Sequence, residues 1–370
     1  MGVRGGPSTR VLPDAPLPVD PRGATSGPSH FAVHGAFSFP KLSRVSISPK
    51  SKILGLGAAT PDKLLTNADL EKLVDTSEEW ILTRTGIRER RVLSDGERIS
   101  DFGTLAARRA LDAAGLGPGD IDAIIGCVYT PDYIAPSCAC IMHGALGLGS
   151  AAAFDLNAAC SGFVYGLEMA DLMIRGGRYR NVIVVGLDAQ TRWVDWSDRA
   201  TCILFGDGAG AVVVGRTDGE DGRGILSTFL GADGTGAEML KVEASGSAVA
   251  PSSPRGCIAM SGREVFKFAV RIMGPAVDEA LRRAEMTVDA IDLLVPHQAN
   301  IRIIDAAAER YGMSGDRVVS NVAKYGNTSA ASIPLALADA QADGRLKPGT
   351  VAALVAFGAG LTYSASIIRW

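Results

Sequence analysis

Short apolar runs alternate with amphipathic stretches along this chain from residue 51 to its end. A run of a few apolar residues predicts a buried strand, and the stretches between the runs have the length and periodicity of helices. This alternation is typical of strand–helix–strand units, which build parallel sheets covered by helices. The sequence therefore predicts a layered α/β fold.

The expected elements are spread over two portions of similar size. Strands are predicted at residues 52–56, 123–129, 153–156, 182–187, 210–214, 291–295, 318–321 and 351–357. Helices are predicted at residues 67–74, 101–114, 161–176, 265–284, 299–311 and 329–342, with a further apolar helix after Pro136. A stretch rich in Gly and Asp at 218–224 divides the portions, so we expect two related α/β halves at residues 51–220 and 221–370.

Residues 1–50 differ from the rest of the chain in composition. They hold eight of the 18 prolines, and their only acidic residues are Asp14 and Asp20. Such a segment buries too little apolar surface to offset the entropy lost on ordering it. We expect an unfolded leader, which is either a transit peptide or the product of an over-long gene start.

Composition argues against several classes of function. The 37 basic and 40 acidic residues give a net charge of −3, so the chain lacks the overall positive field that drives non-specific nucleic-acid binding. The long apolar run at 351–361 is shorter than the ~18–20 residues of a membrane-spanning helix. Hydrophobic residues make up 47% of the 370, which is enough for a large core. We expect a globular enzyme with no nucleic-acid or membrane partner.

The six cysteines indicate a reducing compartment. They are too few and too scattered for a disulfide scaffold, and most lie within apolar segments. Cys138 and Cys140 form a Cys-x-Cys pair, but no second Cys or His pair follows at zinc-ligand spacing. We therefore expect buried thiols, no metal site and a cytoplasmic location, or a plastid if residues 1–50 are a transit peptide.

Cys160 stands between a predicted strand and a nearly all-apolar helix, in A-A-C-S-G-F at 158–163. Backbone N–H groups and the positive dipole end at the start of a helix lower the pKa of a thiol and favour the nucleophilic thiolate. Gly162 removes a side chain where a substrate carbonyl would approach, and the N–H of Cys160 can donate to an oxyanion. The alternative is a buried structural cysteine.

Two polar side chains follow strands in the second portion. His297 comes after the strand at 291–295, and Asn327 comes after the strand at 318–321. Ligands gather at the carboxyl edge of open α/β sheets, where both residues are expected. Taken singly, His297 could equally be a structural histidine, and Asn327 could equally be a turn residue. Together with Cys160 they form a nucleophile with two hydrogen-bond donors.

Five motifs together resemble the thiolase superfamily, and closely the ketoacyl-acyl-carrier-protein synthase III family, which starts type II fatty-acid synthesis. They are T-N-A-D-L-E-K-L-V-D-T-S-E-E-W-I-L-T-R-T-G-I-R-E-R at 66–90, A-A-C-S-G-F at 158–163, F-G-D-G-A-G-A at 205–211, V-P-H-Q-A-N at 295–300 and Y-G-N-T-S-A-A-S at 325–332. The resemblance begins near residue 52 and runs to residue 370. It implies a homodimer with two related halves in α-β-α-β-α layers.

The resemblance also separates members of the superfamily. Biosynthetic thiolases carry a second catalytic Cys near the C-terminal glycine loop, where this chain has A-F-G-A-G at 356–360. Elongating ketoacyl synthases use two histidines, where this chain has His297 and Asn327. The initiating class, which is primed by coenzyme A thioesters, fits best.

The resemblance implies a decarboxylative condensation without a metal or redox cofactor. Cys160 would attack an acyl-CoA primer, and the N–H groups of Cys160 and Ala359 would hold the oxyanion. Malonyl-acyl-carrier protein would then lose CO2, and His297 and Asn327 would hold the resulting enolate. The family usually has Gly where this chain has Ala359, and Ala adopts positive φ less readily.

Further residues receive binding roles from the resemblance. Phe357 would wall the reacting centre. Ala135 would open the acyl pocket, since straight-chain members have Phe at this position, just before a Pro. The alternative is that Tyr133, Ile134 or a residue of a partner subunit closes the gap. Coenzyme A would contact a stacking ring, two arginines and an amide, which are Trp80, Arg84, Arg199 and Asn300.

An acidic carrier protein would need a basic patch, and the matching positions are Arg302, Lys267 and Arg310. An ordinary solvated helix of mixed charge is the alternative for these three residues. F-G-D-G-A-G-A at 205–211 is expected to form a structural turn, because it lacks the remaining features of a dinucleotide fingerprint.

The sequence thus predicts an enzyme that condenses a short acyl-CoA with malonyl-acyl-carrier protein. A starter-unit synthase of a polyketide or quinolone pathway is one alternative. A non-catalytic acyl-binding or carrier-docking homologue is another.

Overall fold

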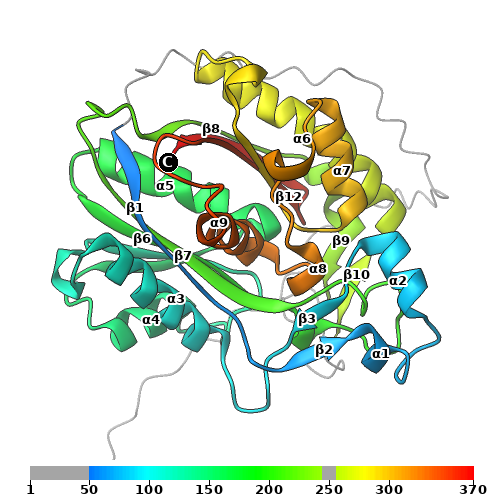
Figure 1. Ribbon diagram of the computed structural model, residues 1–370. Helices are drawn as coiled ribbons and strands as arrows, with labels where there is room; N and C mark the ends of the chain where they lie inside the picture. Colours follow the sequence, from blue (N-terminus) through cyan, green and yellow to red (C-terminus); the bar gives the residue numbers. More distant parts are fainter. Residues whose placement is uncertain (1–49, 244–255) are drawn as a thin grey trace, which may run out of the picture. The chain divides into compact units, whose positions relative to one another are not determined.

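In the computed structural model of this protein, which describes residues 50–243 and 256–370, the first portion of the chain builds a mixed five-stranded sheet (Figure 1). Its strands stand in the order β1-β7-β6-β4-β5. β4 is parallel to β5 and β6, and β7 is antiparallel to β6 and β1. The strands are β1 (Ser51–Ala59), β4 (Ala123–Cys127), β5 (Ala152–Leu156), β6 (Asn181–Ala189) and β7 (Asp207–Arg216).

The second portion builds a four-stranded sheet in the order β11-β12-β13-β8. Only β11 and β12 are parallel in this sheet. Its strands are β8 (Gly224–Ala232), β11 (Leu293–Pro296), β12 (Val351–Gly358) and β13 (Thr362–Arg369). Two short antiparallel pairs lie apart from the sheets, β2 (Leu64–Thr66) with β3 (Glu89–Arg91) and β9 (Leu240–Val242) with β10 (Ile258–Met260).

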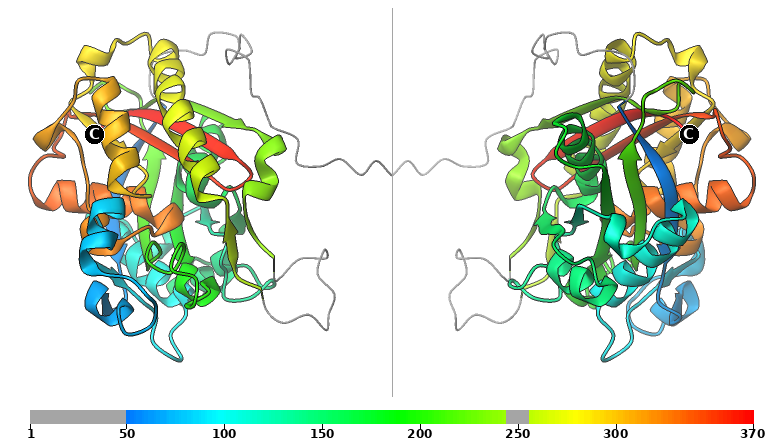
Figure 2. Two further views of the ribbon diagram at one scale, coloured as in Figure 1. Left: turned by 90° about the vertical axis from the view of Figure 1, so that its right-hand side faces the viewer. Right: turned by 90° about the vertical axis from the view of Figure 1, so that its left-hand side faces the viewer.

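Helices cover both sheets and fill the space between them (Figures 1 and 2). α3 (Ile99–Ala114) and α4 (Cys138–Leu146) lie on the outer side of the first sheet. α5 (Gly162–Arg175) and α9 (Ser332–Ala342) lie between the sheets, and α6 (Gly262–Arg283) with α7 (Ile301–Arg310) lies beyond the second. The predicted α-β-α-β-α layering is confirmed. The shorter helices are α1 (Asn67–Leu70), α2 (Glu78–Thr85) and α8 (Val322–Tyr325).

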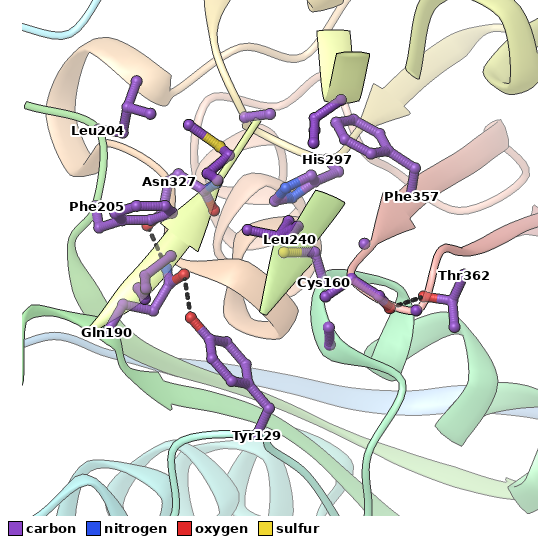
Figure 3. Close-up of a pocket in the computed structure, with 18 of the residues that line it drawn as sticks. Tyr129, Cys160, Gln190, Leu204, Phe205, Leu240, His297, Asn327, Phe357 and Thr362 are labelled. Carbon is purple, nitrogen blue, oxygen red and sulfur yellow. Dashed lines mark hydrogen bonds between the residues drawn. The ribbon is translucent and has the colours of Figure 1, made fainter. Parts of the chain in front are cut away.

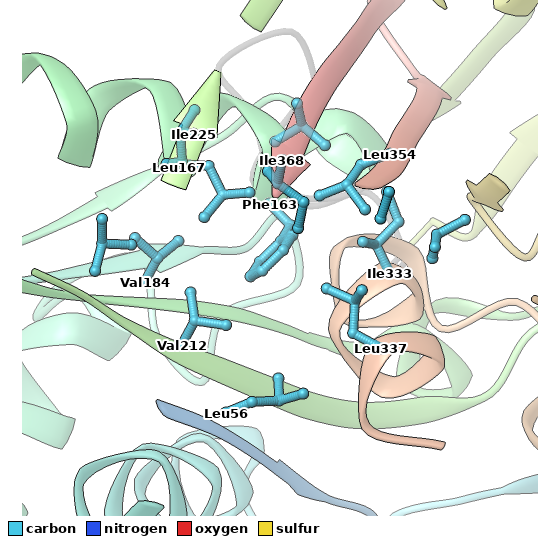
Figure 4. Close-up of a cluster of buried hydrophobic side chains, with 14 of the residues drawn as sticks. Leu56, Phe163, Leu167, Val184, Val212, Ile225, Ile333, Leu337, Leu354 and Ile368 are labelled. Carbon is cyan, nitrogen blue, oxygen red and sulfur yellow. The ribbon is translucent and has the colours of Figure 1, made fainter. Parts of the chain in front are cut away.

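The largest hydrophobic core lies in the middle helix layer (Figure 4). Phe163 and Leu167 of α5 and Ile333 of α9 pack there against Val184 of the first sheet and Leu354 of the second. These side chains are all at most 1% exposed. Because α5 and α9 each begin beside a candidate site residue, this core fixes where those residues stand.

The Cys-x-Cys pair at 138 and 140 lies in the first turn of α4. Ser137 caps the helix by accepting from the Cys140 N–H at 3.1 Å, and Asp155 accepts from the N–H of Cys138 at 2.8 Å. Cys138 is buried and Cys140 is exposed, so the two thiols lie on different sides of the helix. The apolar helix predicted after Pro136 is confirmed.

Most predicted elements are found with shifted ends. The strand predicted at 318–321 is wrong, because this stretch makes only an isolated bridge from Val318 to Leu294. The helix predicted at 67–74 ends at Leu70. The structure adds β8 and β13, which the sequence analysis did not identify.

The predicted leader at 1–50 lies outside the described residues except for Lys50. The predicted boundary between two halves at 220 stays a prediction, although it falls between β7 and β8.

Candidate active site

Cys160, His297 and Asn327 line one cavity of about 450 Å³, although they come from three separate segments. Cys160 follows β5, His297 follows β11 and Asn327 follows α8. Figure 3 shows the thiol, the imidazole and the amide directed into the same space. The structure therefore brings together the three residues that the sequence analysis grouped.

Cys160 sits in a single 3-10 turn, Ala159–Ser161, between β5 and α5. Ala159 has a φ of 46°, in the left-handed region, and its N–H donates to Asn157 Oδ1 at 3.2 Å. This turn carries Cys160 to the cavity wall, where 8% of the residue remains exposed. Burial raises the pKa of the Cys160 thiol to about 12, and the nearby charge of Asp188 acts in the same direction.

Two sequence predictions about this turn are wrong. We expected the start of α5 to lower the thiol pKa, but α5 begins two residues after Cys160, and burial raises the pKa. We also expected Gly162 to leave room for a substrate carbonyl. A Cβ on Gly162 would instead lie in the core, 3.3 Å from Cys127 Cβ and 3.6 Å from Ala330 Cβ. The resting thiol is therefore protonated, and Gly162 serves packing.

The end of β12 packs directly on the backbone of the nucleophile turn. A Cβ on Gly358 would lie 2.7 Å from the backbone nitrogen of Cys160, so no other residue fits there without a shift. Thr362 Oγ1 lies 2.9 Å from the Ala158 carbonyl oxygen and 3.2 Å from the Ala359 carbonyl oxygen, which ties the loop to the turn. Ala359 lines the cavity with a φ outside the left-handed region, so its methyl group causes no backbone strain.

His297 is held by both its backbone and its ring. Its N–H donates to the Val355 carbonyl at 2.7 Å, and its ring stands edge-on to Phe357 with 5.5 Å between centroids. Nδ1 lies 2.7 Å from Ser332 Oγ, so Nε2 is the ring nitrogen left for the cavity. Burial lowers the pKa of His297 to about 3, which keeps the ring neutral near pH 7. Phe357 lines the same cavity, as predicted.

The side-chain amide of Asn327 is oriented by a local turn. Its Oδ1 accepts from the Ser329 N–H at 2.9 Å, so Nδ2 is the end of the amide that remains to donate. Its backbone is fixed as well, since its N–H donates to the Leu204 carbonyl at 2.8 Å and its carbonyl accepts from Gly206 at 2.9 Å. Asn327 and His297 therefore present an amide N–H donor and a neutral imidazole nitrogen to the cavity.

A hydrogen-bonded pair on the cavity wall was missed by the sequence analysis. Tyr129 donates its hydroxyl to Gln190 Oε1 at 2.8 Å, and Gln190 Nε2 donates to the Asn327 carbonyl at 2.6 Å (Figure 3). The backbone N–H of Tyr129 in turn donates to Asp188 at 3.0 Å. Gln190 lies 137 residues from Asn327 along the chain, so no local pattern indicates this contact.

Ala135 does not lie in this cavity within the described chain. It is exposed in the loop before α4, next to Tyr133 and Ile134, which are 52% and 88% exposed. The prediction that Ala135 opens the acyl pocket therefore stays a prediction, because Ala135 is exposed and lies outside the lining of this cavity.

The predicted coenzyme A residues form a cluster on α2 and the segment after η3 (Gln190–Trp193). The guanidinium groups of Arg84 and Arg199 lie 4.7 Å and 4.8 Å from the centroid of the Trp80 ring. Arg199 also donates to the Asp75 carbonyl at 2.7 Å. Asn300 stands apart from this cluster and lines the cavity, where its Oδ1 caps α7.

The three predicted docking cations differ in what holds them. Lys267 pairs with Glu264 at 2.9 Å, and Arg310 pairs with Asp278 at 2.6 Å. Arg302 instead stacks on the Phe266 ring at 5.1 Å, and it is exposed on α7. Phe266 also lines the cavity, so Arg302 contacts a residue of the cavity wall.

F-G-D-G-A-G-A is structural, as expected, but it also reaches the cavity. Asp207 accepts from the N–H groups of Thr191 at 2.9 Å and Leu93 at 2.8 Å, which fastens the start of β7. Phe205 of the same motif lines the cavity. The motif by itself does not indicate this second role.

Comparison with known proteins decides the family. Two profiles match, "3-Oxoacyl-[acyl-carrier-protein (ACP)] synthase III" at residues 154–234 and its C-terminal counterpart at residues 281–370. A beta-ketoacyl-acyl-carrier-protein synthase III from Caldanaerobacter subterraneus is 51% identical over 323 residues, which cover 86% of this chain and 97% of that one. This chain belongs to the beta-ketoacyl-acyl-carrier-protein synthase III family. It is accordingly a condensing acyltransferase of the kind that initiates fatty-acid synthesis.

Solved structures agree with this assignment. The synthase III from Aquifex aeolicus is 46% identical, has a TM-score of 0.81, and matches over 86% of this chain and 100% of that one. The priming beta-ketosynthase of the R1128 polyketide pathway is 38% identical with the same TM-score, over 89% of this chain and 98% of that one. The predicted family and thiolase-like fold are therefore confirmed.

Proposed function

We propose that this enzyme condenses a short acyl-CoA with malonyl-acyl-carrier protein and releases CO2, coenzyme A and 3-ketoacyl-acyl-carrier protein. The observation that carries the proposal is the meeting of one thiol, one neutral imidazole and one side-chain amide in a single cavity, at Cys160, His297 and Asn327. Relatives named for this activity support it.

The first half-reaction transfers the acyl group to Cys160. The sulfur attacks the thioester carbonyl, the carbon–sulfur bond to coenzyme A breaks, and the thiol proton ends on the departing coenzyme A sulfur. The N–H groups of Cys160 and Ala359 support the transient oxyanion. Because burial raises the thiol pKa, we propose that the proton leaves as the new bond forms.

The second half-reaction forms the carbon–carbon bond. The malonyl group loses CO2, and the electron pair of the broken bond becomes an enolate whose oxygen accepts from His297 Nε2 and Asn327 Nδ2. The enolate carbon attacks the acyl carbonyl, and the Cys160 sulfur leaves as a thiolate and takes up a proton from solvent, the one proton that the overall reaction consumes. Two neutral donors stabilise a developing anion without transferring a proton, so we propose that no metal or redox cofactor takes part.

Substrate binding extends the proposal to the surface. The Trp80 ring with Arg84 and Arg199 offers an aromatic face and two cations to the adenine and phosphates of coenzyme A. Asn300 lines the route of the pantetheine arm, and Arg302 meets an acidic carrier protein. We further propose a cytoplasmic location, supported by the absence of disulfides among the six thiols of the described chain. None of the helices described at 50–243 and 256–370 has the length and apolar content of a membrane span.

A homodimer is the proposed assembly. β5 is an edge strand of the first sheet, and within the described residues its outer edge pairs with no other strand. All five of its residues are half-buried. Phe154 and Leu156 of β5 and Met173 of α5 are partly buried hydrophobic residues beside it, and Leu172 of α5 is 50% exposed. A bare edge strand with an apolar flank is suited to pairing with a second copy.

The test is product formation from acetyl-CoA and malonyl-acyl-carrier protein, with butyryl-, isobutyryl- and octanoyl-CoA as competing primers. The proposal predicts 3-ketoacyl-acyl-carrier protein and CO2 in equal amounts. A polyketide starter role, which the R1128 relative favours, would appear as preference for the longer primers over acetyl-CoA. Acyl binding without CO2 release would contradict the proposed reaction and favour a non-catalytic homologue.

A further inference from the structure

Ser332 is the first residue of α9, and its hydroxyl faces the ring of His297. The Oγ–Nδ1 distance is 2.7 Å, and both residues are 1% exposed. Within the described residues, the Ser332 hydroxyl has this ring nitrogen as its hydrogen-bond partner. The contact is therefore shielded from water and is not exchanged for a solvent molecule.

A neutral imidazole carries one proton, on Nδ1 or on Nε2. If the proton is on Nδ1, Ser332 accepts it and Nε2 offers only a lone pair to the cavity. If the proton is on Nε2, Nδ1 must accept, and Ser332 must donate. The second arrangement alone lets His297 donate to an enolate oxygen.

We propose that Ser332 is a positioning residue, which donates its hydroxyl proton to Nδ1 of His297 and so holds the ring proton on Nε2. The inference rests on the proposed function, in which Nε2 donates to the malonyl-derived enolate. Serine suits this task because its hydroxyl rotates about one bond and still has lone pairs available after it donates. Burial keeps the ring neutral, so the tautomer alone decides what His297 offers.

The site around Asn327 supports this assignment. Ser329 fixes the Asn327 amide through its backbone N–H, and Ser332 fixes the His297 ring three residues later in the same segment. The turn that leads into α9 therefore orients both donors toward one point in the cavity. Its sequence, N-T-S-A-A-S at 327–332, carries both functions.

The direct experiment is 15N NMR of the full-length protein labelled at histidine. The chain has four histidines, and a His297→Gln variant identifies the signal of interest. Protonated and unprotonated ring nitrogens resonate in separate regions, so the tautomer can be seen without any substrate. We expect protonated Nε2 in the native protein and a mixture of tautomers in Ser332→Ala. Protonated Nδ1 in the native protein overturns the inference, even if the variant does not fold.

Kinetics provide the second measurement. Ser332→Ala should slow CO2 release from malonyl-acyl-carrier protein roughly tenfold to a hundredfold, a typical effect of removing a group that orients a functional histidine. Acylation of Cys160 and the KM for acyl-CoA should change little. Ser366→Ala is the matched control, because Ser366 is also fully buried and donates to the Ser227 carbonyl at 3.0 Å, away from the cavity lining.

Other outcomes are equally decisive. Equal loss of acylation and decarboxylation in Ser332→Ala, with the Nε2 tautomer unchanged, overturns the inference and leaves a packing role. Failure of the native enzyme to release CO2 counts against the proposed function instead. The NMR result still decides the Ser332 assignment in that case, because it needs no turnover.

Discussion

Burial keeps the thiol of Cys160 and the ring of His297 uncharged in the resting enzyme. Each residue loses most of its water, and this loss moves the pKa of the thiol to about 12 and that of the imidazole to about 3. A neutral pair in an apolar cavity offers no strong base. Negative charge therefore develops only on bound substrate, at positions toward which backbone and side-chain donors already point.

The two donors should matter more for the second half-reaction than for the first. His297→Ala and Asn327→Ala are each expected to slow malonyl decarboxylation by about 2–4 kcal/mol in activation free energy, as removal of an oxyanion donor does. Acylation of Cys160 should survive, because the oxyanion site proposed for that step consists of backbone N–H groups. Separate assays of CO2 release and acyl-enzyme formation check this, and equal loss in both assays would refute the division of roles.

The burial of His297 also predicts how stability depends on pH. Its pKa is about 3 in the folded chain and 6.5 ordinarily, so the unfolded state binds more protons once the pH falls below 6.5. Asp188 acts in the opposite sense between about 6 and 3.8, since burial raises its pKa to about 6. Comparing native protein with His297→Gln cancels the Asp188 contribution.

From about pH 7.5 to about pH 5, native protein should lose roughly 2 kcal/mol more unfolding free energy than His297→Gln. Urea denaturation at the two pH values measures the difference. An equal loss in both proteins would show that His297 is not held neutral by burial.

The three central residues could be predicted from the sequence because short motifs carry them. Cys160 follows a strand, and His297 and Asn327 lie in motifs specific to the family. The contacts that orient them could not be predicted, since Gln190 meets Asn327 across 137 residues and Ser332 meets His297 across 35. The prediction of a lowered thiol pKa was wrong for a related reason: the burial of Cys160 depends on segments that are distant in the sequence.

At the scale of elements, the site depends on how closely β12 approaches the nucleophile turn. Gly358→Ala should place a methyl group 2.7 Å from the Cys160 nitrogen, which is backbone and does not move aside easily. We expect a loss of roughly 1–3 kcal/mol in stability and a marked loss of acylation. Gly119→Ala is the control, since nothing lies within 4 Å of its added Cβ. Thermal unfolding and acylation rates that match native protein would contradict this packing argument.

The start of α7 gives a second prediction at this scale. Arg302→Glu should raise the KM for malonyl-acyl-carrier protein about fivefold at low salt and leave acylation by acyl-CoA unchanged. Lys267→Ala should have a smaller effect, because Lys267 is already paired with Glu264. The effect of Arg302→Glu should fade at high salt, where surface charges are screened. A salt-independent change, or an equal change in Lys267→Ala, would argue against docking at Arg302.

The elements that the sequence analysis missed have a physical reason. β8 and β13 pair with each other and contribute buried residues to a sheet that also holds the predicted β12. β13 does alternate between polar and apolar residues over 362–367, but Ser364 and Ser366 are fully buried, so its polar positions do not mark a solvent-facing side. The strand predicted at 318–321 has the right composition, yet it lies at the sheet edge with a single bridge to β11.

At the scale of the whole molecule, β5 predicts the assembly. The Ala152 N–H donates to Asp122 and the Leu156 carbonyl accepts from Val128, so the backbone of Ala153 faces away from β4. Ala153→Pro removes one outward N–H and should convert a dimer into a monomer in sedimentation velocity, with the far-UV circular dichroism retained. Ala153→Val keeps the N–H and should remain dimeric. A monomeric native protein would refute the proposed assembly.

The central claim is that Cys160 carries the acyl group during the reaction. Intact-protein mass spectrometry after incubation with acetyl-CoA tests it most directly, with Cys160→Ala beside native protein. Our account predicts one added acetyl group on the native chain and none on the variant, and circular dichroism should show that the variant remains folded. An acetyl adduct on Cys160→Ala, or no adduct on native protein with any of the acyl-CoA primers, would contradict the account.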